Sequence, residues 1–501
     1  MNLETLITSL STDDFVKFDS FLKDKNRRTD VKNTALFKLI YSNTHSSEEI
    51  KEKLYPQKTK GAYHALRSRL FNSLIDFLAS STLEDENNER IQIIKLITVA
   101  RLQLEKREFK LALKLLNKAE VIANEYQYYG YLNEIYHLKI EHSNNLESLE
   151  LEYLITSFKK NQQQYFLEEE MNIVYAKIKK LLHQIRYEGK TTNFQELLSS
   201  TIESHNINYN DNLSFKSLYQ LLTIASISAS VTKDFLVIEP FMLETYQILE
   251  QRADKEKQTY FHIQVLFMIA NTLFRNKKFE KSLHFLSLMQ KLMISNRKKY
   301  YTRFLHKYEL LKALNLNYTD NQSSAIANLE LLLAKKHNDT ESTLDIHLSL
   351  IVFYFQKNEF QNAYKLLKNL HHTDKYYTGK VGKEWIIKKG LIELLLLIEL
   401  DYVDVFENKL FRFRRQHRKY LKENNLEKVL VFLKLVEDYY KNPKLIFSEK
   451  FLERIENSFE WVGAKREDIF EMSFYAWLKS KILQKPLYEV TLDFVEQAKK
   501  K

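Results

Sequence analysis

The sequence predicts an all-α protein, built as a right-handed solenoid of antiparallel helical hairpins that follows a small amino-terminal helical bundle. The 501 residues include only 7 Gly and 4 Pro, fewer breakers than the turns of a sheet protein of this length require. A pattern of small, aromatic and aliphatic residues also recurs at similar spacing along the chain, as in repeat proteins. The 44% hydrophobic content, with 32 Phe and 30 Tyr, supplies enough apolar side chain for a folded core.

Residues 1–82 form the predicted amino-terminal module, because they lack the recurring pattern. Ser11 with Asp14, and Ser46 with Glu49, have the spacing of capping boxes, in which side chains satisfy free amides at a helix start. Hydrophobic periodicity predicts short helices that form a bundle, over residues 3–9, 12–23, 31–43, 47–54 and 59–80.

The last two of these helices have the outline of a helix-turn-helix, because only residues 55–57 separate them. The second begins with basic residues and has no acid before Asp76, so its start can present cations to phosphates or base edges. The candidate nucleic-acid or anion contacts are Lys58, Lys60, Arg67 and Arg69.

A purely structural interpretation explains the same helix. Ala62, Leu66, Leu70, Leu74 and Phe77 give it a buried stripe, and basic residues on the opposite face then lie in solvent. The first 90 residues also balance 14 basic against 14 acidic side chains. Both interpretations remain open from the sequence.

An acidic, polar stretch over residues 83–90 is the predicted linker, and residues 91–444 repeat a hairpin unit that is clearest over Ile351–Leu370. Ala363 follows Ile351 by twelve residues, and a small residue at this point lets two helix backbones approach. Phe360 lies beside the predicted turn at residues 357–359, and Leu367 continues the apolar stripe. The spacing therefore predicts two packed helices joined by a tight turn.

The same spacing recurs upstream and downstream of this unit. Clear copies begin at Ala100, Ala270 and Ala313, and weaker copies use larger residues after Ser226 and Leu394. Together with two marginal copies, the first-helix anchors fall at residues 100, 137, 185, 226, 270, 313, 351 and 394, a mean step of about 42 residues.

The pattern of Ala100, Phe109, Ala112 and Ala119 resembles tetratricopeptide repeats, whose second-helix alanines and aromatic residue near the turn it matches. The chain is similar to uncharacterised bacterial proteins of this kind that carry a short amino-terminal helical domain. It departs from the family in lacking the first-helix glycine and the closing proline. Its step also exceeds the family's roughly 34 residues, which predicts longer helices.

Residues 445–501 are the predicted carboxy-terminal capping helices. Phe470, Phe474, Trp477 and Leu478 share an apolar face that can cover the exposed end of the repeat stack, as solenoids require. Residues 490–501 are expected to form a frayed final helix.

The composition and motifs exclude several classes of function. The absence of cysteine excludes disulfides, thiolate metal sites and cysteine nucleophiles. GKVGK at residues 379–383 is too short for a phosphate-binding loop, and the spacing of His137, Glu141 and His142 does not match a zinc-protease motif. We therefore expect no enzyme activity, cofactor or metal.

The start of the chain does not have the pattern of a signal peptide. The apolar runs along the chain are too short and too charged to span a bilayer. We therefore expect a cytoplasmic protein without membrane contact. The sequence does not predict an oligomeric state.

In tetratricopeptide arrays the first helix of each hairpin lines a concave groove, so the resemblance implies a partner-binding groove here. Amide and guanidinium groups at the matching positions suit a peptide backbone or a carboxylate. An alternative is that these side chains are merely solvated while the neighbouring phenylalanines pack between hairpins. The groove candidates are Arg101, Asn271, Arg275, Asn317 and Gln356.

The densest charge run is KLFRFRRQHRKYLK at residues 409–422, within a chain of net charge +11. Arg412, Arg415, Lys419 and Lys422 share one face of the predicted helix, so they can contact a nucleic acid or another anion. A solvated helix face explains the same residues without a partner.

The sequence thus predicts a non-enzymatic scaffold or adaptor that binds a protein or peptide partner along the groove. The alternative is a nucleic-acid-binding regulator, in which the amino-terminal helix-turn-helix contacts DNA or RNA and the repeats sense a ligand or oligomerise.

Overall fold

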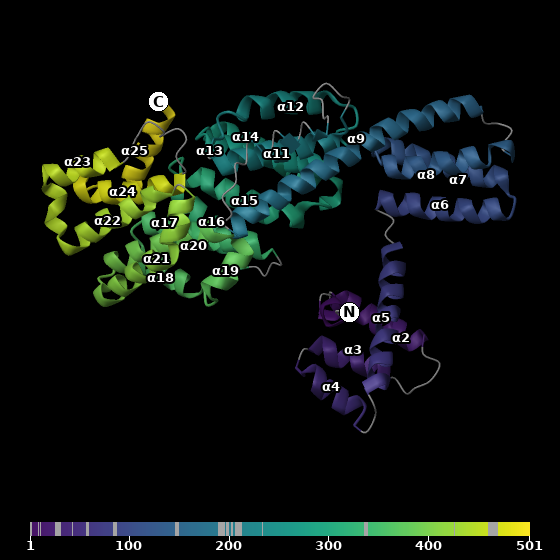
Figure 1. Ribbon diagram of the computed structural model, residues 1–501, viewed down its shortest axis with the longest axis horizontal. Coiled ribbons are helices and arrows are strands. Elements are labelled where there is room, and N and C mark those ends of the chain that lie inside the picture. Colours follow the sequence, from purple (N-terminus) through teal and green to yellow (C-terminus); the bar gives the residue numbers. More distant parts are fainter. Residues whose placement is uncertain are drawn as a thin grey trace. The chain divides into compact units, whose positions relative to one another are not determined.

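The computed structural model describes residues 3–8, 10, 12–25, 32–42, 44–56, 60–83, 88–145, 150–188, 196, 200–201, 204–205, 213–232, 234–334, 339–424, 426–458 and 469–500. Their regular elements are all helices, and none of these residues lies in a strand (Figure 1). The all-α fold class predicted from the sequence is confirmed. Contacts divide the chain into two units, residues 1–161 and 162–501.

The first unit begins with a module of short helices: α1 (Leu3–Thr8), α2 (Thr12–Lys25), α3 (Lys32–Ser42), α4 (Ser47–Leu54) and α5 (Lys60–Leu83). Ser46 and Glu49 form the predicted capping box at the start of α4. The Ser46 amide donates to Glu49 Oε2 at 2.7 Å, and the Glu49 amide donates to Ser46 Oγ at 3.3 Å. Ser11, from the other predicted box, lies outside the described residues.

Helix α5 supplies one wall of the core of this module. Its buried stripe runs through Tyr63, Leu66, Leu70, Leu74 and Phe77, at the three- and four-residue spacing of one helix face. The predicted stripe is confirmed except at its first residue. Ala62 is half-buried, and the neighbouring Tyr63 is buried instead.

The first unit continues with α6 (Glu89–Glu105), α7 (Phe109–Glu125), α8 (Tyr129–Glu141), η1 (Ser143–Asn145) and the start of α9 (Leu151–His183). Ala100, Ala112, Leu116 and Ala119 are completely buried where α6 and α7 pack together. The predicted linker overlaps the end of α5 and the start of α6, and its residues 84–87 lie outside the described ranges.

The second unit contains the rest of α9, then η2 (Gln184–Glu188), α11 (Phe215–Thr232), α12 (Glu239–Gln251), α13 (Thr259–Arg275), α14 (Phe279–Lys298), α15 (Tyr301–Asn317), α16 (Gln322–Leu333), α17 (Thr340–Gln356), α18 (Phe360–Lys368), α19 (Asp374–Val381), α20 (Lys383–Glu399), α21 (Val403–Glu423), α22 (Glu427–Lys441), η3 (Pro443–Phe447), α23 (Glu449–Ser458), α24 (Ile469–Leu483) and α25 (Leu487–Lys500). From α13 to α18, and again from α19 to α23, each helix packs against the next one in the chain, α24 packs against α25, and α18 packs against α20.

Five of the predicted anchors share one turn geometry. The residue seven positions after the anchor has a left-handed backbone, and the next helix begins two residues later. In the first copy this residue is Arg107, with φ of 62°, and the Glu108 amide donates to the Gln103 carbonyl at 2.8 Å, as in a Schellman helix end. The left-handed residues, with φ between 58° and 63°, are Arg107, Lys277, Asp320, Asn358 and Asp401.

The same register continues into the second helix of each copy. The residue twelve positions after the anchor is completely buried in all five copies, as Ala112, Ser282, Ala325, Ala363 and Phe406. The recurring pattern found in the sequence therefore marks a recurring local structure at anchors 100, 270, 313, 351 and 394.

The marginal copies do not follow this register. His137 lies on α8, and Ile185 lies in η2 at the end of α9, a helix of 33 residues. The residues that follow the anchor at Ile185, 189–195 and 197–199, lie outside the described ranges. Helix α19 is an additional helix between α18 and α20, so the alternation of paired helices is interrupted there.

Replacing Asp401 with glycine should raise the free energy of unfolding by up to about 1 kcal/mol, because a left-handed backbone strains every residue except glycine. Asp401 is exposed and its φ is 58°, so the substitution removes little packing. Urea unfolding measures the effect. Asp401→Val is the matched control and should lower stability, and a lower stability for Asp401→Gly would contradict the explanation.

Candidate functional site

The five predicted groove residues do not form one exposed surface. Arg101 is on α6 in the first unit, where its guanidinium lies 2.8 Å from Glu134 Oε1. The other four are in the second unit: Asn271 and Arg275 are half-buried on α13, and Arg275 lies 5.8 Å from the ring centroid of Phe235. Asn317 and Gln356 are 0% and 1% exposed.

Asn317 and Gln356 belong to a buried hydrogen-bond network. Asn317 Nδ2 donates to Gln356 Oε1 at 2.9 Å, and Gln322 Nε2 donates to Asn317 Oδ1 at 3.2 Å. Gln356 Nε2 in turn donates to Ser473 Oγ on α24 at 2.9 Å. The expectation that these two amides face an open groove is corrected here, because their polar atoms are bound by other side chains of the chain.

Helices α24 and α25, named here the C-terminal pair, cover these amides. Ser473 of α24 contacts Gln356 of α17, and the Tyr488 hydroxyl of α25 donates to the Asn317 carbonyl of α15 at 2.6 Å. On α24, Trp477 Nε1 donates to Glu399 Oε1 of α20 at 2.5 Å. The pair therefore lies across the carboxyl ends of three first helices of the repeats.

The C-terminal pair matches the predicted cap at three described residues and differs from it in the last helix. Phe474, Trp477 and Leu478 are buried as predicted, whereas the side chain of Phe470 is outside the description. The last helix, expected to fray, is α25, and its Val490, Thr491, Val495 and Ala498 are at most 1% exposed. Ser473, a polar residue on the apolar face of α24, was the sequence signal for a buried polar contact.

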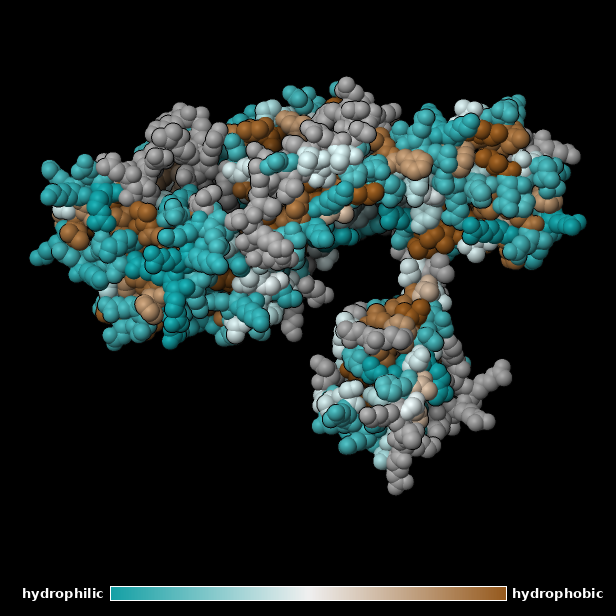
Figure 2. Space-filling view, in the orientation of Figure 1, coloured by the Kyte–Doolittle hydropathy of each residue, from teal (hydrophilic) through white to brown (hydrophobic). Residues whose placement is uncertain are grey.

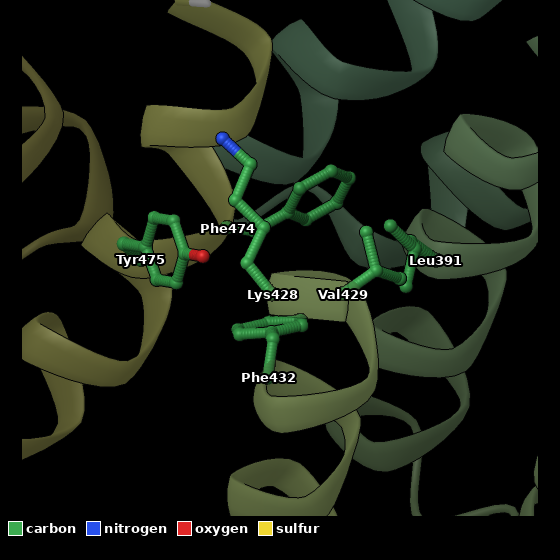
Figure 3. Close-up of a pocket in the computed structure, with 6 residues that line it drawn as sticks. All are labelled: Leu391, Lys428, Val429, Phe432, Phe474 and Tyr475. Carbon is green, nitrogen blue, oxygen red and sulfur yellow. The ribbon is translucent and has the colours of Figure 1, made fainter. Parts of the chain in front are cut away.

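Two hollows border the C-terminal pair. The first lies between α20, α22 and α24, where the rings of Phe432, Phe474 and Tyr475 face a common space together with Leu391, Lys428 and Val429 (Figure 3). The space open to the centre of a water molecule in this hollow is about 20 Å³. One or two waters fit there, whereas a larger ligand does not. The second is an open, partly polar pocket of about 430 Å³ beside Asn358, Glu399, Lys481 and Lys485.

The cations predicted in the amino-terminal module are placed differently from one another. Arg67 forms a two-pronged ion pair with Glu4, and its Nη2 lies 2.9 Å from Glu4 Oε2. The hydrogen bond from Arg67 lowers the pKa of Glu4, and the bond to Glu4 raises the pKa of Arg67. Arg69 is exposed, Lys58 lies outside the described residues, and the side chain of Lys60 is not described.

Arg67 is therefore held by an internal carboxylate, which competes with any phosphate for the same guanidinium. Among the four predicted cations, Arg69 is the one that the structure describes as exposed.

The basic face of α21, defined as Arg412, Arg415, Arg418, Lys419 and Lys422, is exposed to solvent. Phe411, 66% exposed, adjoins it, and the Arg415 guanidinium lies 5.8 Å from its ring centroid. Phe411 and Arg418 were missed as site residues, although 411, 415, 418 and 422 have the spacing of one helix face. Figure 2 shows mainly hydrophilic surface over α18–α21, with small hydrophobic spots.

Most cations of the basic face have no internal counter-charge. Lys419 lies 3.7 Å from Glu423, whereas Arg412, Arg415, Arg418 and Lys422 form no ion pair with any residue that the structure describes. Two neighbours on α21 are different: Lys409 lies 2.7 Å from Glu393, and Arg414 lies 2.8 Å from Glu437.

Internal contacts fix the orientation of α21. Leu410 and Phe413 are buried, and His417 and Tyr420 are half-buried. Burial lowers the pKa of His417, so its imidazole adds little charge near neutral pH. On α22, hydrogen bonds from Lys441 and then Arg414 hold the pKa of Glu437 at about 2. The basic face is thus carried on a helix whose other side is anchored.

Neither the described side chains nor the comparisons with known proteins indicate a metal site, a membrane-spanning helix or a family. Among the described residues no cluster of His, Asp or Glu has the arrangement of a metal site, and no helix there is long and apolar enough to cross a membrane. No protein-family model matches the chain, and no curated protein matches it significantly in sequence.

Proposed function

We propose that this protein is a non-enzymatic scaffold that binds an acidic segment of a protein partner on the basic face of α21. The repeated part of the chain is, in this proposal, a right-handed solenoid of antiparallel hairpins similar to tetratricopeptide repeats. The turn register shared by anchors 100, 270, 313, 351 and 394 supports that architecture.

The observation that carries the proposal is the set of uncompensated cations on the basic face. Arg412, Arg415, Arg418 and Lys422 lie within eleven residues of one helix, about 16 Å of its length, beside the exposed ring of Phe411. Like charges this close repel one another, so an anionic partner relieves that repulsion while forming ion pairs. An exposed aromatic at the edge of a charged surface is a common anchor in protein interfaces.

A protein partner fits this face better than a nucleic acid does. Single-stranded nucleic acids bind through several aromatic stacking platforms along a basic groove, and Phe411 is the exposed ring at this stripe. A helix with acidic residues every three or four positions matches the spacing of the cations directly. In the amino-terminal module, the Arg67 bond to Glu4 removes one of the predicted phosphate contacts.

The double charge reversal Arg415→Glu with Arg418→Glu should weaken binding of an acidic, amphipathic helical peptide about tenfold or more, because two favourable pairs become repulsive. Fluorescence anisotropy of the labelled peptide at low salt measures the affinity. Wild-type affinity should also fall as salt is added.

The matched control is Lys114→Glu with Lys118→Glu, which makes the same change in net charge at exposed positions on α7. This variant should bind the peptide within about twofold of the wild type. An oligonucleotide of equal charge that binds the wild type more tightly than the peptide does would replace the protein partner with a nucleic acid. Equal losses in the two variants would show that net charge alone drives binding.

A further inference from the structure

The exposed face of α21 carries acids near its start as well as cations near its end. Asp404 and Glu407 are exposed, and neither forms an ion pair with any residue that the structure describes. They share one side of the helix with Phe411 and Arg415, because these positions follow one another at steps of three and four residues. We name this exposed row the charged stripe, and its members are Asp404, Glu407, Phe411, Arg415, Arg418 and Lys422.

The acids and the cations of the charged stripe do not neutralise each other on their own helix. Glu407 and Arg415, the nearest acid and cation, are eight residues apart, about 12 Å of helix length, and no ion pair joins them. The helix dipole favours Asp404 in the first turn and Lys422 in the last turn. It falls off within those turns, so it does not explain Glu407 or the arginines between them.

The charged stripe is complementary to a second copy of itself. Asp404 precedes Phe413 by nine residues and Lys422 follows it by nine, while Glu407 precedes it by six and Arg418 follows it by five. Two copies of α21 that lie antiparallel across a two-fold axis near Phe413 therefore bring each acid of one copy opposite a cation of the other. One such contact forms four ion pairs, two at each end.

Phe411 supplies an apolar centre for the same contact. It precedes Phe413 by two residues and Arg415 follows by two, so the ring of one copy faces the guanidinium of the other, as in a cation–π pair. The Phe411 ring is 66% exposed in the single chain, and the contact would bury this apolar area in both copies. A central aromatic with charged groups around it is the common arrangement of protein interfaces.

We propose that the basic face of α21 binds the acidic start of α21 in a second copy of this chain, which forms an antiparallel, two-fold dimer. This inference rests on the proposed function, because it takes the basic face as the binding surface and names its acidic partner. A second copy pairs both ends of the charged stripe in one contact, whereas a separate acidic helix leaves Asp404 and Glu407 without a counter-charge.

Sedimentation velocity of the full chain at low salt tests the dimer with two variants of opposite charge. Arg418→Glu with Lys422→Glu places acids at both ends of the charged stripe, and Asp404→Lys with Glu407→Lys places cations at both ends. Each variant alone should raise the Kd of the dimer about tenfold or more, because the opposed groups repel. An equimolar mixture should restore the dimer, because all four pairs are again of opposite sign.

The matched control is Lys114→Glu with Lys118→Glu on α7, which changes the net charge as much as Arg418→Glu with Lys422→Glu does. It should dimerise as the wild type does. The inference is overturned if the wild type is monomeric at the highest concentration at which it stays soluble. It is also overturned if the mixed variants stay monomeric, or if each variant alone dimerises as the wild type does.

Peptide binding separates this inference from the proposed function. Asp404→Lys with Glu407→Lys keeps the whole basic face, so this variant should bind the acidic peptide as a monomer. Peptide binding by a wild type that never dimerises would overturn the second copy as partner and leave the proposed function standing. Failure of this variant to bind the peptide would contradict the proposed function itself, and this inference with it.

Discussion

Replacement of Gln356 by leucine should lower the free energy of unfolding of the second unit by about 2–3 kcal/mol. Leucine has a similar size but no polar atoms, so Asn317 Nδ2 loses the acceptor that lies 2.9 Å away and Ser473 Oγ loses its bond from Gln356. Asn317 is completely buried, and a buried polar group left without a partner costs about 1–3 kcal/mol. The loss exceeds what one exposed hydrogen bond would contribute.

Urea unfolding followed by tryptophan fluorescence measures this effect in the relevant part of the chain. All three tryptophans, at 385, 461 and 477, fall within residues 162–501, so their signal reports on the second unit. Gln361→Leu is the matched control, because Gln361 is exposed on α18, and its effect should stay within about 0.5 kcal/mol. Equal midpoints for the two variants would show that the amide network adds nothing to stability.

The repeat register could be predicted from the sequence because it depends on local spacing. A small or apolar residue twelve positions after an anchor, as at Ala112 and Ala363, marks the buried face of the second helix wherever the turn has fixed length. The turn itself was harder to predict, because its left-handed residue is not glycine in any of the five copies and includes Arg107 and Lys277. The helix-end hydrogen bonds, rather than a glycine, hold that conformation.

The cover over Asn317 and Gln356 could not be predicted in the same way. Periodicity shows which face of a helix is apolar, and a polar residue at its edge is ordinarily assigned to solvent. Gln356 is buried by Ser473, which lies 117 residues further along the chain, and no local pattern connects the two. The long helix α9 and the additional helix α19 were also missed.

The two predicted basic clusters show that a run of basic residues in the sequence does not by itself identify a binding surface. Both have cations on one helix face, but Arg67 meets Glu4, a residue 63 positions earlier, whereas Arg412, Arg415 and Arg418 meet no acid among the described residues. A counter-charge distant in sequence thus occupies one cation of the first cluster, Arg67. The second cluster keeps its charge, and it therefore carries the proposed function.

Replacing Gly390 with alanine should destabilise the second unit by about 1–2 kcal/mol. A Cβ atom at this position would lie 2.6 Å from Phe413 Cε2 and 2.8 Å from its Cδ2, so the buried ring would have to move. That cost exceeds the gain of about 0.5–1 kcal/mol that alanine brings inside a helix. Gly379→Ala is the matched control, because no atom lies within 4 Å of the added Cβ, and it should raise stability.

A double-mutant cycle with Phe413→Leu separates this crowding from other effects of Gly390. Leucine lacks a carbon at the place of Cε2, the atom nearest to the added Cβ, and its δ carbons can rotate away, so Gly390→Ala should cost less in that background, a coupling of about 1 kcal/mol. An unchanged cost would mean that Phe413 is not the obstacle.

The same crossing of α20 and α21 sets the direction of the basic face, so Gly390→Ala should also weaken binding of the acidic peptide, and Phe413→Leu should partly restore it. A half-buried glycine on α20 would then control a surface on α21 that it does not touch.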